Sequence, residues 1–138
     1  MIIIGVLAAI AIPVFLNQRK KANDTAGKAD VSTLGKEIAT YYVDATSALT
    51  AAGVTGPAAG ASGRYTVNGT DAGKASNNIS TPVFNPGPSA GFLTANPSAT
   101  FSTAWCVQIA VSGGTQTAYK YSATNGLAQG TCTSGTDY

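Results

Sequence analysis

The first sixteen residues of the chain, Met1 to Leu16, contain no charged and no polar side chain. As a helix rising 1.5 Å per residue, such a run reaches about 24 Å, slightly less than the ~30 Å hydrocarbon core of a bilayer. A signal peptide also contains an apolar segment, but it places a charged region first, and no charge precedes this run. Because so large an apolar surface is unstable in water, the segment is expected to enter a membrane or to pack against copies of itself.

The helical pattern continues past the apolar run with one apolar stripe. Its members recur at spacings of three and four and are Val31, Leu34, Ile38, Tyr41 or Tyr42, Ala45 and Leu49. The pattern predicts one helix from Met1 to about Leu49. Pro13 should kink it unless neighbouring groups satisfy the freed carbonyl.

Charged residues occupy the other sides of this helix. Lys20 and Asp24, and likewise Asp24 and Lys28, stand at the i,i+4 spacing of helical ion pairs. Asp30, Glu37 and Asp44 recur every seven residues, and we expect them to be solvated surface.

After Leu49 the composition changes to Ala, Gly, Thr, Ser, Asn and Pro, and the helical period ends. Strands are expected at residues 64–67, at 78–84 on a sheet edge because of Pro82, at 103–112 and at 115–122. In the third of these, Trp105, Val107, Ile109 and Val111 alternate with smaller or polar residues. Gly113-Gly114 is expected to form a two-residue hairpin turn, and Asn125-Gly126 the next turn. Residues 50–63 and 85–97 are expected to be exposed loops.

These patterns predict an α+β fold in which a long N-terminal helix packs on a small antiparallel sheet. Its segments are an apolar part of the helix at residues 1–22, an amphipathic part at 23–49, and an antiparallel β head with long loops at 50–138.

Two cysteines, Cys106 and Cys132, stand 26 positions apart and form no CxxC motif. A structural disulfide fits this spacing, and it would persist only outside the reducing cytosol. The alternative is a pair of buried free thiols in a cytosolic protein.

Composition excludes most catalytic chemistry. The chain has no histidine, so the commonest general base and the commonest transition-metal ligand are missing. Charged residues make up only 10% of the chain, and the net charge is +2. We therefore expect no enzymatic activity, no cofactor, no metal site and no strong nucleic-acid binding.

The sequence GVLAAIAIP at residues 5–13, followed by VFLNQRKKA at 14–22, resembles the N-terminal helix of type IV pilins, and the NQRKKA part is similar to pilins of Gram-positive bacteria. The resemblance implies a structural subunit of an extracellular pilus, a homopolymer held as a single-pass protein in the cytoplasmic membrane before assembly. It also implies an assembly ATPase, a platform protein and a prepilin peptidase as partners. The residues expected in the filament core are Gly5, Val6, Leu7, Ala8, Ala9, Ile10, Ile12, Pro13 and Phe15.

Family members begin with an aromatic residue after processing, and they carry a glutamate inside the apolar helix. The apolar run here contains neither feature at those places, so the processing site and the assembly carboxylate are not assigned to any residue of this chain. We expect them in a preceding segment of about nine residues plus a leader, which would bring the apolar helix to a membrane-spanning length.

The basic cluster Arg19-Lys20-Lys21 follows the apolar run. It is expected either to be a solvated helix turn, to pair with acids of a neighbouring subunit such as Asp24 or Asp30, or to touch DNA phosphates. By the positive-inside tendency it would place the head in the cytoplasm, which conflicts with a disulfide, and we follow the disulfide and the resemblance.

The alternative function is a minor pilin or pseudopilin that acts in DNA uptake or in secretion of the type II kind. A membrane-tethered extracytoplasmic enzyme is remote, because the sequence offers no nucleophile and base pair.

Overall fold

The computed structural model describes residues 2–87, 102–133 and 136–137 as one long helix followed by two small antiparallel sheets. Helix α1 spans Ile2–Asp44, and a single 3₁₀ turn, η1, spans Ala51–Gly53. The first sheet has the order β1-β2-β3, with strands Val54–Thr55, Arg64–Val67 and Thr70–Lys74. The second has the order β4-β5-β6-β7, with strands Val83–Asn85, Cys106–Ala110, Ala118–Ser122 and Gly126–Gln129. The expected α+β class is confirmed, although the division into two sheets was not predicted.

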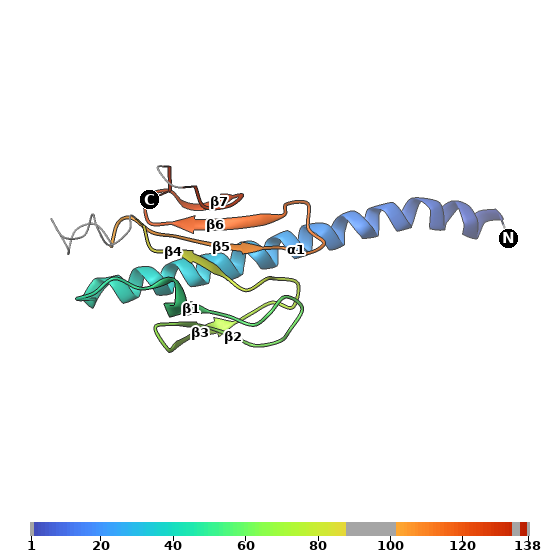
Figure 1. The fold of residues 1–138 in the computed structure, drawn as a ribbon. Helices are drawn as coiled ribbons and strands as arrows, with labels where there is room; N and C mark the ends of the chain where they lie inside the picture. Colours follow the sequence, from blue (N-terminus) through green and yellow to red (C-terminus); the bar gives the residue numbers. More distant parts are fainter. Residues whose placement is uncertain (1, 88–101, 134–135, 138) are drawn as a thin grey trace.

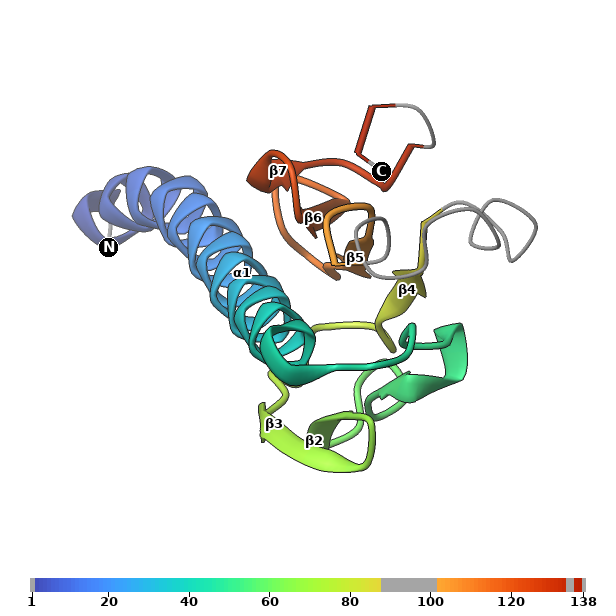
Figure 2. The ribbon, with the colours of Figure 1, turned by 90° about the vertical axis from the view of Figure 1, so that its left-hand side faces the viewer.

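The head lies beside the C-terminal half of α1, and the N-terminal half projects beyond it (Figure 1). Viewed from the end of the helix, β5, β6 and β7 lie on one side and β2 and β3 on another (Figure 2). Helix α1 contacts strands of both sheets. It is therefore the element that joins the two halves of the head.

The helix ends earlier than the sequence pattern predicts, at Asp44 rather than near Leu49. Leu49 is nevertheless buried, because the chain folds back and the Leu49 amide donates a hydrogen bond of 3.2 Å to the Tyr42 hydroxyl. The apolar residue at the end of the stripe thus reaches the core through a reversal of the chain. At its other end α1 continues through Pro13, and the blue N-terminal part curves gently (Figure 1).

The apolar stripe of α1 is buried against the sheets as expected. Val31, Leu34 and Ile38 are fully buried, and Tyr42 is 8% exposed. The Trp105 ring stacks at 6.3 Å from the Tyr42 ring and at 6.1 Å from the Tyr121 ring, so it connects the helix to β6. Its indole nitrogen donates to the Ser102 carbonyl at 3.1 Å.

Three of the four expected strands have counterparts close to their predicted places. Residues 64–67 form β2, the expected strand at 103–112 corresponds to β5, and the one at 115–122 corresponds to β6. Trp105 and Val111, which flank β5, are buried. The expected strand at 78–84 is only an isolated bridge between Ile79 and Val111 followed by β4, which lies at the edge of its sheet. Strands β1, β3 and β7 were not predicted.

One of the two expected turns differs from the prediction. Asn125 closes the connection from β6 to β7, as expected. The Gly113-Gly114 turn is wider than two residues, because β5 ends at Ala110 and β6 begins only at Ala118. Residues 50–63 are mainly exposed loop but contain β1, and residues 88–97 of the other expected loop lie outside the described residues.

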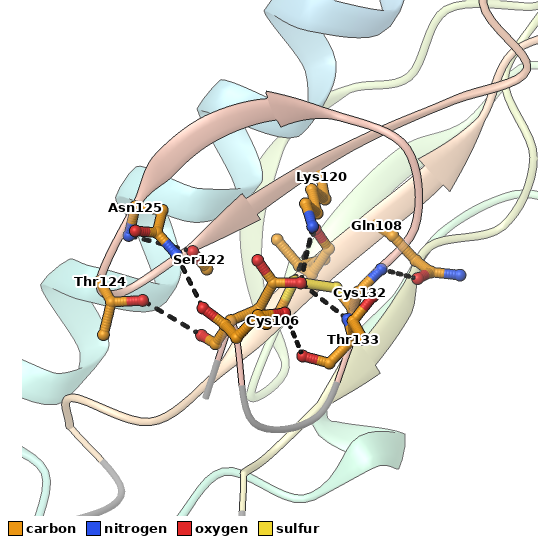
Figure 3. The surroundings of a disulfide bond; sticks show 11 residues. Cys106, Gln108, Lys120, Ser122, Thr124, Asn125, Cys132 and Thr133 are labelled. Carbon is orange, nitrogen blue, oxygen red and sulfur yellow. Dashed lines mark hydrogen bonds and ion pairs between the residues drawn. A yellow bond between two sulfur atoms is a disulfide. The ribbon is translucent and has the colours of Figure 1, made fainter.

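Several contacts hold the C-terminal segment to the second sheet, among them a disulfide and a buried ion pair (Figure 3). Cys106 of β5 is bonded to Cys132, which confirms the disulfide and excludes the free-thiol alternative. The buried Asp137 carboxylate forms an ion pair with Lys120 of β6 at 2.7 Å and accepts the Thr133 amide hydrogen at 2.7 Å. Burial would raise the pKa of the Asp137 carboxyl, but these bonds lower it below its ordinary value.

Replacing both cysteines by alanine should lower the free energy of unfolding by about 3.5 kcal/mol, the chain-entropy value for a loop of this size. Thermal unfolding of the variant and the parent in the same mild detergent measures the difference. An unchanged midpoint would contradict a stabilising disulfide.

Two glycines of α1 let the second sheet approach the helix closely. A Cβ atom at Gly35 would lie 2.3 Å from the Tyr121 ring, and one at Gly27 would lie 2.4 Å from a Val111 methyl group. Both distances are far below van der Waals contact. These positions therefore require the absence of a side chain.

Gly35→Ala should destabilise the head by about 1–3 kcal/mol, because overpacking outweighs the gain in helix propensity. Gly5→Ala is the matched control, since nothing lies within 4 Å of a Cβ atom there. We expect the control to unfold at the parent temperature or slightly above it. Equal midpoints for all three proteins would show that α1 does not pack this closely.

Candidate functional site

The candidate site is the N-terminal part of α1, where every described residue from Ile2 to Ala22 is exposed. Leu7 is 62% exposed, Ile10 64% and Phe15 67%. By length and composition, α1 is the one helix among the described residues that is apolar enough to cross a membrane, and its most apolar window is not covered by the rest of the chain. We call residues 2–16 the stem.

The stem presents apolar surface on all sides. It carries ten of the thirteen exposed large apolar side chains of the described residues, and the others are Val43, Val83 and Leu127. The expected core residues Gly5, Val6, Leu7, Ala8, Ala9, Ile10, Ile12, Pro13 and Phe15 all belong to it. Full burial of a large apolar side chain gains about 1.5–3 kcal/mol. The whole stem therefore has a strong tendency to associate with an apolar partner.

The head begins where α1 meets the connection between β5 and β6. The Asp24 carboxylate is 6% exposed and accepts hydrogen bonds from the Thr115 amide at 3.0 Å and the Gln116 amide at 3.2 Å. It also accepts a hydrogen bond from the Thr115 hydroxyl. Burial alone would raise the pKa of this carboxyl, but the hydrogen bonds from Thr115 and Gln116 outweigh it and hold the pKa below its ordinary value.

Asn23 complements Asp24 on the same connection. Its side-chain amide donates to the Gly113 carbonyl at 2.8 Å and to the Ser112 carbonyl at 3.3 Å. A Cβ atom at Gly114 would lie 2.3 Å from an Asp24 carboxylate oxygen, so this approach requires glycine. The two adjacent side chains thus hold both the carbonyls and the amides of one loop.

A second buried carboxylate holds the first sheet. Asp30 is 8% exposed and accepts hydrogen bonds from the Tyr65 hydroxyl at 2.9 Å and the Ser76 amide at 2.8 Å. The Ser76 hydroxyl donates to its other oxygen at 3.1 Å. Burial of the Tyr65 side chain, and then its own hydrogen bond to Asp30, raises the pKa of Tyr65.

These contacts correct the expectation that Asp24 and Asp30 lie on the solvated side of the helix. The i,i+4 ion pairs of Asp24 are not formed either, because its carboxylate is engaged by the β5–β6 connection. Lys28 instead places its ammonium 5.4 Å from the centre of the Tyr119 ring. No local sequence signal marks the two aspartates, since their partners lie 35 to 92 positions away.

Arg19, Lys20 and Lys21 are exposed. The ion pairs among residues 2–87, 102–133 and 136–137 join Arg64 to Asp71 and Lys120 to Asp137, so they do not include this basic cluster. The pairing with a neighbouring subunit stays a prediction for the three basic residues. The Asp24 carboxylate already accepts hydrogen bonds from Thr115 and Gln116 of its own chain.

Within the described residues there is no group of three or more histidine, cysteine, aspartate or glutamate side chains that could hold a metal ion. The arrangement combines an uncovered apolar surface, the stem, with a head that packs on the same helix.

Comparison of the chain with protein-family models, with curated protein sequences and with solved structures found no match. The resemblance to type IV pilins therefore rests on the helix sequence at residues 5–22.

Asp24→Asn should destabilise the protein by about 1–3 kcal/mol near pH 7, because one of two acceptor oxygens is lost from a site with several donors. The pKa of Asp24 is lower in the folded than in the unfolded protein. The contribution of Asp24 to the free energy of unfolding is therefore complete at a pH above its pKa in the unfolded protein, about 3.9. It is lost as the pH falls through the pKa of Asp24 in the folded protein.

The measurement is the unfolding temperature of the parent and Asp24→Asn between pH 7 and pH 2. We expect the gap between the two to narrow in acid. Asp44→Asn, at the exposed end of α1, is the control and should match the parent at every pH. A gap independent of pH would mean that the charge of Asp24 does not contribute.

Proposed function

We propose that this protein is the structural subunit of an extracellular type IV pilus-like filament. The observation that carries the proposal is the bare apolar stem, residues 2–16, which continues the helix that anchors the head. Before assembly the stem lies in a membrane, and on assembly it packs against the stems of other copies.

Several features support this function. Each large apolar side chain of the stem gains on the order of 1.5–3 kcal/mol when it leaves water, so the stem needs a continuous apolar environment in both states. The disulfide favours an extracytoplasmic head. The resemblance of residues 5–22 to pilin helices points to the same kind of filament.

The packing of the head fits a repeating subunit. Both sheets are held by buried carboxylates to α1, the helix that continues into the stem. A subunit that must present its stem at a fixed angle to many identical neighbours benefits from such an attachment.

Leu7→Lys or Ile10→Lys should abolish filaments. A lysine at the centre of a bilayer-spanning helix costs about 2.5–3.5 kcal/mol, and a similar penalty recurs at every subunit of the filament core. Ala39→Lys is the control, because it adds the same charge at an exposed position of α1 beside the head. Electron microscopy of sheared surface filaments, with quantitative mass spectrometry of their protein, is the measurement.

The proposal holds if the parent chain is the main component of the filaments and only the stem variants lose them. Filaments that persist with Leu7→Lys and Ile10→Lys would contradict it. If the chain is only a trace component, it acts as a minor pilin or pseudopilin instead.

A further inference from the structure

An open cleft of about 780 Å³ lies where the stem leaves the head. Leu16, Arg19 and Lys20 of α1 form one wall, and Asn77, Ser80 and Val111 belong to the opposite wall. The connection between β5 and β6, which contributes residues 111–113 to the lining, lies at the end of the head nearest the projecting part of α1 (Figure 1).

The cleft is electropositive. Arg19 and Lys20 both line it, and no aspartate or glutamate does. The ion pairs among the described residues leave these two side chains out. The nearest acid along α1, Asp24, is not part of the cleft lining, and its carboxylate accepts hydrogen bonds from Thr115 and Gln116. The ligand that such a cleft favours is an anion.

The position of the cleft restricts which anion it meets. Leu16 is the last residue of the apolar run and is 49% exposed on the cleft wall, and Arg19 follows within one helical turn. If the stem lies in a membrane, as the proposed function requires, the cleft opens at the depth of the phospholipid headgroups. Basic side chains at this depth attract anionic lipids.

We propose that the cleft binds the headgroup of one anionic phospholipid while the subunit is held in the membrane. Arg19 and Lys20 contact the phosphodiester, and the Asn77 side chain faces the polar part of the headgroup. The apolar wall at Leu16 lies beside the start of the acyl chains. The proposal rests on the proposed function, because it needs the stem in a bilayer.

The test is native mass spectrometry of the full chain in neutral detergent with added phosphatidylglycerol or phosphatidylcholine. We expect one phosphatidylglycerol to be retained and phosphatidylcholine to be lost. Arg19→Gln combined with Lys20→Gln should weaken retention about 30-fold, as expected for two basic side chains at an anionic surface. Asn77→Asp should also weaken it, because it places a carboxylate in the cleft.

Lys36→Gln combined with Lys74→Gln is the matched control, since it removes the same charge at exposed positions outside the cleft. This control should retain the lipid as the parent does. Equal losses in both double variants, or equal retention of the two lipids, would overturn the proposal. Displacement of the lipid by millimolar glycerol phosphate would also overturn it, because the site would then recognise a soluble phosphate.

Flotation with phosphatidylcholine vesicles separates this proposal from the proposed function. A parent chain that does not float with the vesicles contradicts membrane insertion and therefore the function. A chain that floats but shows no preference for phosphatidylglycerol contradicts the lipid site alone.

Discussion

Two buried carboxylates on one helix hold the two sheets of the head in place. Asp24 and Asp30 are six residues apart, which rotates their side chains by roughly 120° around the helix axis. The two sheets lie on different sides of the helix (Figure 2). Because buried carboxylates need partners, each fixes a loop: Asp24 the β5–β6 connection and Asp30 the segment at Ser76.

This attachment explains how one helix can serve two environments. On the C-terminal side of Ala22 the helix packs against the head, and on the N-terminal side the same helix is exposed. The glycines at positions 27 and 35 bring the second sheet against the helix, and the disulfide closes the far end of that sheet. No stem residue is buried in the head, which leaves the stem available for a membrane or for other copies of the chain.

The long helix, its apolar stripe and the strand around Trp105 could be predicted because each has a period that the sequence displays locally. The attachment of the two sheets to the helix could not be predicted in this way. Asp24 and Asp30 look like solvated helix charges, and their burial depends on donors that are distant in sequence, such as Thr115 and Tyr65. Strand β3, Thr70–Lys74, was missed for a related reason: Asp71 and Gly73 are poor strand formers, and pairing with β2 overrides their propensity.

The central claim is that the stem is the surface through which copies of the chain associate. A photo-crosslinking residue at position 10, in filaments mixed from ordinary and isotopically heavy subunits, tests it most directly. Mass spectrometry then identifies the crosslinked peptides. We expect mixed-isotope crosslinks from position 10 to residues 2–16 of another copy. Crosslinks from position 10 only to head strands, or none between copies, would contradict it.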